Sequence, residues 1–223
     1  MGVVYLVRHG QASLGAADYD RLAERGQVQA QRLGAYWQAR GRCFDAVYTG
    51  TLQRHAQTLA GIVAALPDLP PACVRPELDE YDSAALIRAI HPGPLARVDT
   101  PERARAHFRL LCDALAQWMA GTISPEGMPD WDDFASGVRT LLDEVRRTHA
   151  DGQVLVVSSG GPIATAVAQV LGVTPEVGIA LNMRLRNSSV SELSVSPRRM
   201  MLQTFNTLAH LSAPGDEALV TYA

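Results

Sequence analysis

The chain has few of the features that mark secreted, membrane-spanning or nucleic-acid-binding proteins. Its 223 residues include only three cysteines, at positions whose spacing matches neither a metal-ligand pair nor a disulfide framework. The formal net charge is −3 at pH 7, so we expect neither nucleic acid nor an anionic membrane as a partner. No apolar segment is long enough to span a bilayer, and we expect no signal peptide. Together these absences favour a reducing, cytoplasmic location.

What is present is the composition of an ordinary globular protein. Hydrophobic residues make up 47% of the chain and charged residues 19%, which is enough for a sizeable core. We find no internal repeat and no low-complexity tract. The sequence predicts a single domain over residues 1–223 that carries an insertion.

Short apolar runs rich in β-branched residues predict the strands of a central sheet. They cover residues 3–7, 45–49, 154–158, 190–195 and 201–205. The first three are followed by helix-like segments, of which the second spans 52–66 and is closed by Pro67. That alternation of strand and helix predicts a mostly parallel sheet between two helical layers, an α/β/α sandwich.

The middle of the chain follows a different pattern. Residues 67–91 are rich in proline and aspartate with little periodicity. Two apolar stripes at helical spacing follow: Phe108, Leu111, Leu115 and Met119, then Phe134, Val138, Leu141 and Val145. We interpret residues 77–150 as an α-helical insertion over the mouth of the sheet.

Polar and glycine-rich segments follow the predicted strands, where the ligands of open α/β sheets bind. Arg8-His9-Gly10 follows the first strand, and Arg54 lies in the first turn of the helix after the second. The turn from Ser158 to Gly161 follows the third strand, and a carboxylate cluster, Glu77, Asp79 and Glu80, enters the insertion. Arginine binds phosphate through a planar fork, and amides at a helix N-terminus bind anions. The turn lacks the lysine and the spacing of nucleotide-binding loops, so we expect no cofactor.

Taken together, these segments resemble the histidine phosphatase superfamily, the phosphoglycerate mutase-like proteins. Residues 22–30 resemble the first helix of that family, and Phe205-Asn206 with His210-Leu211 resemble its C-terminal signature. The resemblance implies an enzyme that needs neither cofactor nor metal. Its substrate would be a small phosphomonoester and its product inorganic phosphate.

The resemblance also implies a role for each site residue. His9 would attack phosphorus and carry it as phosphohistidine, while Arg8, Arg54, Ser159 and Gly160 would bind phosphate oxygens. Glu80 would protonate the leaving oxygen and then activate water. Glu77 and Asp79 remain competing assignments for that acid, because the sequence does not say which carboxylate points inward.

The chain departs from the family at Ser159, where members usually carry a second histidine. A neutral hydroxyl donor contributes about 1 kcal/mol against roughly 1.5–3 for a charge-assisted one, so we expect reduced activity. Gly15 also stands where relatives often carry an asparagine. Four other histidines are candidates to replace the missing one: His55, His91, His107 and His210.

Two alternative functions remain open. A phosphoglycerate mutase would share the first half-reaction but needs a basic pocket for the substrate carboxylate, and residues 80–83 are acidic. A catalytically weak pseudo-enzyme that binds phosphorylated ligands is the other alternative, suggested by Ser159. The sequence names neither the substrate nor the oligomeric state.

Overall fold

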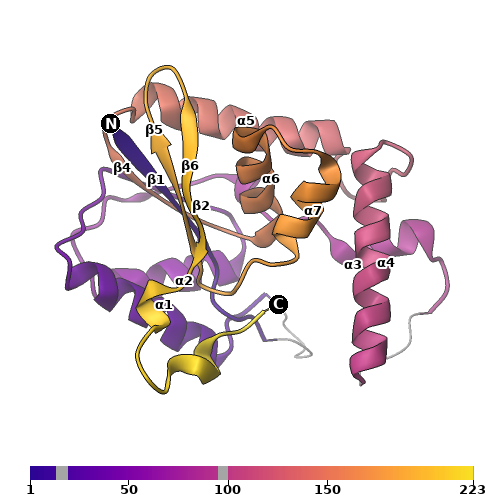
Figure 1. The fold of residues 1–223 in the computed structure, drawn as a ribbon, viewed down its shortest axis with the longest axis horizontal. Helices are drawn as coiled ribbons and strands as arrows, with labels where there is room; N and C mark the ends of the chain where they lie inside the picture. The colour runs from indigo at the N-terminus through magenta and orange to yellow at the C-terminus, as the bar shows by residue number, and fades with distance from the viewer. Residues whose placement is uncertain (14–19, 95–99, 223) are drawn as a thin grey trace.

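A six-stranded sheet forms the centre of the protein (Figure 1). The computed structural model describes residues 1–13, 20–94 and 100–222. The sheet contains β1 (Gly2–Arg8), β2 (Ala46–Thr49), β3 (Ala72–Val74), β4 (Gln153–Ser158), β5 (Val190–Val195) and β6 (Met200–Thr207) in the order β3-β2-β4-β1-β5-β6. The neighbours from β3 to β1 pair in parallel, whereas β5 pairs antiparallel with both β1 and β6.

Helices cover both faces of the sheet. One face carries α1 (Glu24–Gln38) and α2 (Gln53–Val63), and the other carries α5 (Trp131–Thr148) and α6 (Gly160–Leu171). The remaining helices, α3 (Ser83–Ile90), α4 (Pro101–Met119) and α7 (Pro175–Asn182), lie to the right in Figure 1. Short 3₁₀ turns are η1 (Pro76–Leu78), η2 (Ala209–Leu211) and η3 (Asp216–Leu219).

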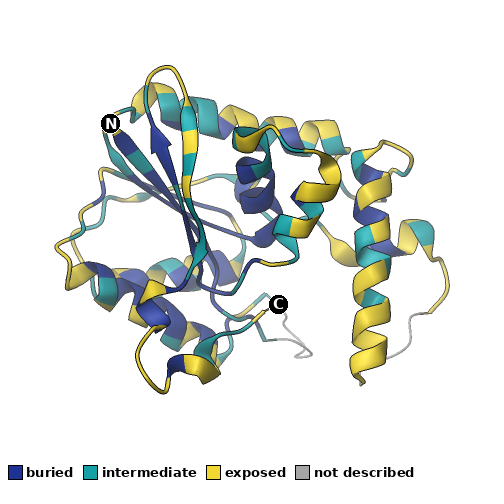
Figure 2. Ribbon diagram, viewed as in Figure 1, coloured by how far each residue is buried: buried dark blue, intermediate teal, exposed yellow. Residues whose placement is uncertain are grey.

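The two-residue period of the strands divides the core into two halves. In β1, Val4 and Leu6 pack with α5 and α6, while Tyr5 and Val7 pack with α1 and α2. The same alternation runs through residues 154–157 of β4. Successive side chains of a strand point to opposite faces, so a strand that is apolar throughout has to lie between two helical layers. Figure 2 shows the central strands buried along most of their length.

A third apolar cluster joins α3, α4 and α5 around a fully buried tryptophan, Trp118. The rings of Trp131 and Phe134 lie 5.2 Å and 5.3 Å from that ring, centroid to centroid. Further along α5, Val138 and Leu141 belong instead to the core against the sheet. One helix therefore connects the aromatic cluster rigidly to the sheet.

The expectation of a mostly parallel sheet between helical layers is confirmed, and each of the five predicted strands is present with ends shifted by two residues at most. The second predicted helix ends at Val63 rather than at residue 66. The proline-rich segment contains a strand and a helix that its sequence pattern did not predict. β3 has only three residues and α3 only eight, and elements this short show no clear period. The Asp82 side chain starts α3 by accepting hydrogen bonds from the amides of Ala84 and Ala85.

Two further observations concern the described part of the chain. None of its helices combines the length and the apolar character needed to cross a membrane. All three cysteines are free thiols.

Two helix glycines provide a matched test of the close approach between α1 and the first loop. A Cβ on Gly26 would overlap the Gln11 backbone, whereas one on Gly178 would meet Ala168 at an ordinary 3.5 Å. Alanine favours a helix over glycine by about 1 kcal/mol, and steric overlap costs roughly 1–3 kcal/mol. We expect Gly26→Ala to lower the free energy of urea unfolding and Gly178→Ala to leave it unchanged or raise it. Equal effects would contradict this account of the α1 contact.

Candidate active site

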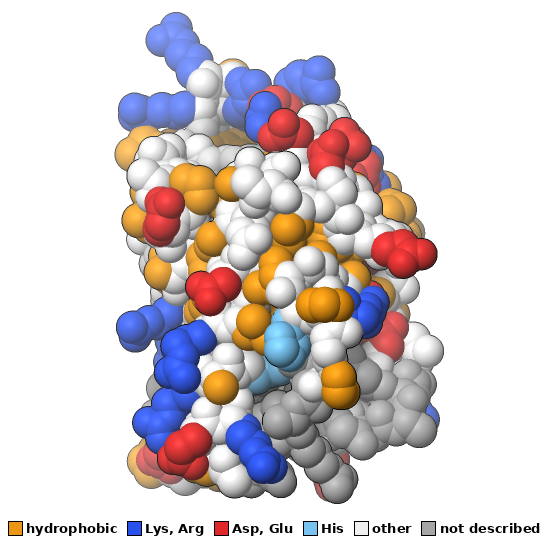
Figure 3. Space-filling model, turned by 90° about the vertical axis from the view of Figure 1, so that its right-hand side faces the viewer, with side chains coloured by type: hydrophobic (Ala, Val, Ile, Leu, Met, Phe, Trp, Pro, Cys, Tyr) orange, Lys and Arg blue, Asp and Glu red, His pale blue; other side chains and the backbone are white. Residues whose placement is uncertain are grey.

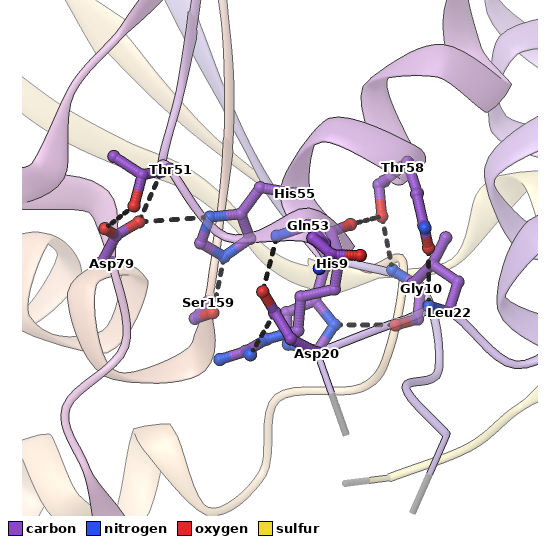
Figure 4. Close-up of polar contacts among 12 residues, drawn as sticks. His9, Gly10, Asp20, Leu22, Thr51, Gln53, His55, Thr58, Asp79 and Ser159 are labelled. Atoms are coloured by element: carbon purple, nitrogen blue, oxygen red, sulfur yellow. Dashed lines mark hydrogen bonds and ion pairs between the residues drawn. The ribbon is translucent and has the colours of Figure 1, made fainter. Parts of the chain in front are cut away.

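The carboxyl ends of three parallel strands meet at one edge of the sheet and bring the sequence-predicted residues together. The register pairs Arg8 of β1 with Ser158 of β4, and Thr49 of β2 with Val157 of β4. The His9 amide then donates to the Ser158 carbonyl over 2.9 Å. His9 and Ser159 therefore both lie at this edge of the sheet, each one residue beyond its strand (Figure 4).

The His9 imidazole is held in one tautomer. Its Nδ1 lies 2.7 Å from the Gly10 carbonyl, which can only accept, so Nδ1 carries the proton and Nε2 keeps its lone pair. The ring is buried, and burial together with the positive charges of Arg8 and Arg54 lowers the pKa of His9 well below its ordinary value. His9 is therefore a neutral imidazole at neutral pH, with a free nucleophilic nitrogen.

The backbone around His9 is fixed from two sides. The Gly10 amide donates to the Thr58 hydroxyl over 3.0 Å, and the His9 carbonyl accepts from the Ser188 amide over 3.1 Å. Ser188 has a positive φ of 58°, and its hydroxyl lies 2.9 Å from Nε2 of the buried His210. These contacts leave the backbone at His9 little freedom to move.

Both predicted phosphate-binding arginines are buried at this edge. An Nη of Arg8 donates to the Leu185 carbonyl, which aligns the guanidinium along the end of β1. Arg54 forms a 2.7 Å ion pair with Asp20, and the same carboxylate accepts from the Gln53 amide at the start of α2. Buried guanidinium groups in fixed orientations suit the oxygens of a phosphate.

The turn after β4 adds the N-terminus of α6. A Cβ placed on Gly160 would lie 3.8 Å from Arg8 Nε and 3.6 Å from Glu80 Oε2, so these groups share one small space. Ser159, the N-cap residue of α6, is fully buried, and its hydroxyl makes no capping hydrogen bond. A helix N-terminus in this position favours an anion.

The three candidate carboxylates separate clearly in the structure. Glu77 pairs with Arg75 over 3.3 Å, and Asp79 accepts from both the amide and the hydroxyl of Thr51. Only Glu80 among them lies beside Gly160, where it accepts from the Gly161 amide over 2.9 Å. Burial raises the pKa of Glu80 above its ordinary value, although Arg8 and Arg54 oppose the shift. Glu80 is thus the carboxylate best placed to carry a proton into this space.

Of the four histidines considered as replacements, His55 is the one that lies beside His9. Its ring centroid is 5.8 Å from that of His9, and its Nε2 lies 2.7 Å from the Ser159 hydroxyl. His91 is exposed, and His107 lies on the largely exposed first half of α4. His210 contacts Ser188, and Gly15 falls outside the described residues.

A cavity of about 240 Å³ lies between α4, α5, α6 and α7. Most of the cavity lining is apolar. The lining also includes Asn182, Tyr81, which follows Glu80 in the chain, and Gly161, whose amide donates to the Glu80 carboxylate. Hydrophobic side chains gather at the centre of the face shown in Figure 3, beside histidine, with most charged side chains toward the edges. The cavity offers room for an apolar group next to the Glu80 segment.

Some residues that build the site carry no signal in the sequence. Asp20 and Ser188 each anchor a site residue from a segment that no motif marks, whereas Thr58 belongs to the same helical segment as Arg54. The His55 side chain points into the site although helical spacing turns it about 100° from Arg54. Both side chains point into the site only because α2 packs against the ends of the strands.

A family model described as the histidine phosphatase superfamily (branch 1) matches residues 4–208. The chain belongs to the histidine phosphatase superfamily. The matched segment includes His9, both buried arginines, Glu80 and Ser159. No curated protein sequence matches the chain.

Solved structures of phosphatases and mutases share the fold of this superfamily member. A phosphoserine phosphatase from Entamoeba histolytica in complex with 3-phosphoglyceric acid matches with a TM-score of 0.66 and 19% identity, over 95% of this chain and 100% of that one. A mycobacterial glucosyl-3-phosphoglycerate phosphatase has a TM-score of 0.62 and 23% identity, with 92% and 98% covered. A phosphoglycerate mutase from Bacillus anthracis has a TM-score of 0.63 and 18% identity, with 93% and 94% covered. At these identities the likeness establishes the fold and not the substrate.

The support of His9 by Ser188 and His210 predicts a pH dependence of stability. Burial lowers the pKa of His210 from 6.5 to about 4, so the unfolded chain binds the proton that the folded protein rejects. The contribution of neutral His210 to the free energy of unfolding is fully present above pH 6.5. It is lost, by about 3 kcal/mol, as the pH drops toward 4. We expect His210→Gln to fall less steeply than wild type in urea unfolding over this range. Parallel stability curves would contradict this assignment.

Proposed function

We propose that the protein is a phosphatase that hydrolyses a small phosphomonoester through a phosphohistidine at His9. The observation that carries this proposal is the state of His9. The ring is buried and neutral, donates from Nδ1 to the Gly10 carbonyl over 2.7 Å and is close enough to Arg8 and Arg54 for their charges to lower its pKa. Its Nε2 is therefore available as a nucleophile beside groups that bind anions. No other described side chain combines these properties.

In the first step, the Nε2 lone pair of His9 forms a bond to phosphorus while the bond from phosphorus to the leaving oxygen breaks. Arg8, Arg54 and the α6 N-terminus neutralise the equatorial oxygens. Glu80, whose raised pKa favours the protonated acid, gives its proton to the leaving oxygen. The products are an alcohol or phenol, phosphohistidine and the Glu80 carboxylate.

In the second step, water attacks phosphorus and the phosphorus–nitrogen bond breaks. The Glu80 carboxylate takes the proton of that water, which regenerates the acid, and the electron pair returns to His9 Nε2. Inorganic phosphate leaves. The same two groups thus serve both half-reactions, and no cofactor enters the scheme.

The cavity beside the Glu80 segment supports a substrate whose leaving group has an apolar part. Tyr81 and Gly161 contribute to its lining, and the Glu80 carboxylate contacts the Gly161 amide. An aryl phosphate is therefore a reasonable first substrate to test.

Replacement of the nucleophile tests the proposal directly. We expect wild type to hydrolyse p-nitrophenyl phosphate and to retain ³²P from a labelled substrate on His9, and we expect His9→Ala to lose both. His149→Ala is the matched control, because His149 precedes β4 at the opposite edge of the sheet and contacts Tyr48. Equal turnover in wild type and His9→Ala would overturn the proposal.

The alternatives give different results in the same assays. Interconversion of 2- and 3-phosphoglycerate without release of phosphate would favour a mutase. Tight binding of vanadate without turnover and without label on His9 would favour a pseudo-enzyme.

The role of Glu80 predicts a change in the pH profile. Only the protonated acid can assist departure of the leaving group, so the rate of the first step should fall as the pH rises through the raised pKa of Glu80. We expect Glu80→Gln to lose this basic limb and to slow alkyl phosphates by about 10²–10⁴-fold. p-Nitrophenyl phosphate should suffer less, because its leaving group needs little protonation.

The measurement is the pre-steady-state release of the leaving group. Glu77→Gln serves as the matched control, since Glu77 pairs with Arg75 outside the site. A basic limb that persists in Glu80→Gln but disappears in another carboxylate variant would assign the acid elsewhere.

A further inference from the structure

A series of contacts leads from a carboxylate through an imidazole to a hydroxyl at the edge of the site (Figure 4). The Asp79 carboxylate lies 3.6 Å from Nδ1 of His55, and His55 Nε2 lies 2.7 Å from the Ser159 hydroxyl. Asp79 is itself held by the amide and the hydroxyl of Thr51. The three side chains come from separate segments, so their alignment is a product of the tertiary fold.

The chemistry of these groups fixes where the protons lie. Asp79 is ionised, because the nearby His55 imidazole and two hydrogen bonds from Thr51 lower its pKa despite partial burial. Nδ1 of His55 faces this carboxylate at 3.6 Å, and the negative charge favours the tautomer that carries its proton on Nδ1. Neutral His55 then accepts the Ser159 proton at Nε2. Protonated His55 instead donates from Nε2 to the Ser159 oxygen, which frees the hydroxyl proton to point elsewhere.

The surroundings of His55 set its charge. It is fully buried, and burial together with Arg54 lowers its pKa, whereas Asp79 and Asp20 oppose that shift. The His9 ring, 5.8 Å away, is the other titratable group facing it. A phosphate dianion between Arg8, Arg54 and Ser159 adds negative charge to this balance and therefore favours the imidazolium.

We propose that His55, oriented by Asp79 and acting through the Ser159 hydroxyl, supplies the cationic imidazole that this site lacks at position 159. The inference rests on the proposed function, since it assigns a role toward the phosphoryl group bound there. Ser159 contacts that group and His55 is a positioning residue behind it. When the anion enters, His55 takes a proton and donates to Ser159, and Ser159 donates to a phosphoryl oxygen.

The same three residue types also form the triad of serine hydrolases, but the backbone disfavours that role. In the α/β-hydrolases among them, the reactive serine sits on a strained turn between a strand and a helix. Ser159 has extended dihedral angles, φ −110° and ψ 175°, and serves as the N-cap of α6. It lies beside two buried guanidinium groups that suit an anion better than an ester carbonyl.

Removal of the imidazole at position 55, followed by its return at position 159, is the decisive experiment. We expect His55→Ala to lower kcat for p-nitrophenyl phosphate by about a hundredfold, the effect of losing one preorganised donor. The double variant His55→Ala/Ser159→His should recover at least a tenfold part of that loss. Ser159→His alone should be less active than the double variant, because His55 Nε2 already occupies the space 2.7 Å from the Ser159 oxygen.

A binding measurement separates an effect of the His55 charge from an effect of its packing. Sulfate stays a dianion throughout the neutral pH range, so its binding reports on protein groups alone. We expect wild type to bind sulfate more weakly as the pH rises through the pKa of His55 in the complex. His55→Gln keeps a hydrogen-bond donor toward Ser159 but cannot titrate, so its sulfate binding should depend less on pH than that of wild type while it remains folded by circular dichroism. The dependence that remains is assigned to Glu80, the other buried group in this space with a shifted pKa.

The outcomes separate this inference from the proposed function. Turnover that depends on His9, together with an unchanged kcat in His55→Ala or no recovery in the double variant, would overturn the inference alone. Sulfate binding whose pH dependence is identical in wild type and His55→Gln would do the same. Covalent labelling of Ser159 by a fluorophosphonate probe would replace it with a nucleophilic role. Wild type that neither turns over phosphomonoesters nor binds sulfate would overturn both.

Discussion

The parallel pairing of β1 with β4 is the constraint on which the rest of the site depends. It sets Arg8 opposite Ser158, and the hydrogen bond from the His9 amide to the Ser158 carbonyl extends the ladder one residue further. A shift of one residue in this register would turn every side chain to the opposite face. Because both strands are buried on two faces by apolar side chains, such a shift is strongly disfavoured. The packing of the core thus fixes the relative positions of the site residues at the ends of β1 and β4.

Burial then determines the protonation states. His9, beside two arginines and a second imidazole, is kept neutral by the cost of desolvating one more positive charge. Burial has the opposite consequence for Glu80, where it favours the protonated acid. Two groups near the same pair of arginines therefore have pKa shifts in opposite directions, a pattern that separates a proton donor from a neutral imidazole.

The sequence predicted the architecture better than it predicted the polar network. Strands β1 and β4 are apolar over residues 3–7 and 154–157 and were recognisable because burial on both faces leaves a continuous hydrophobic run. Strand β3 and helix α3 were not, since three and eight residues are too few to show a period. The motifs pointed to Arg8 and His9, but only the structure shows that Glu80, rather than Glu77 or Asp79, lies beside Gly160. Neighbouring side chains in an irregular segment point in directions that no local pattern encodes.

The sequence by itself determined the fold class, the superfamily resemblance and the presence of serine at position 159. These properties reside in short contiguous segments, whose periodicity and residue types are readable without knowledge of their neighbours. Only the tertiary structure decided what stands beside that serine. His55 and Ser159 are 104 residues apart in the chain, and Asp79 comes from a third segment. Their meeting depends on how α2, η1 and α6 pack around the strand ends, because long-range side-chain contacts are fixed by the packing of the whole core.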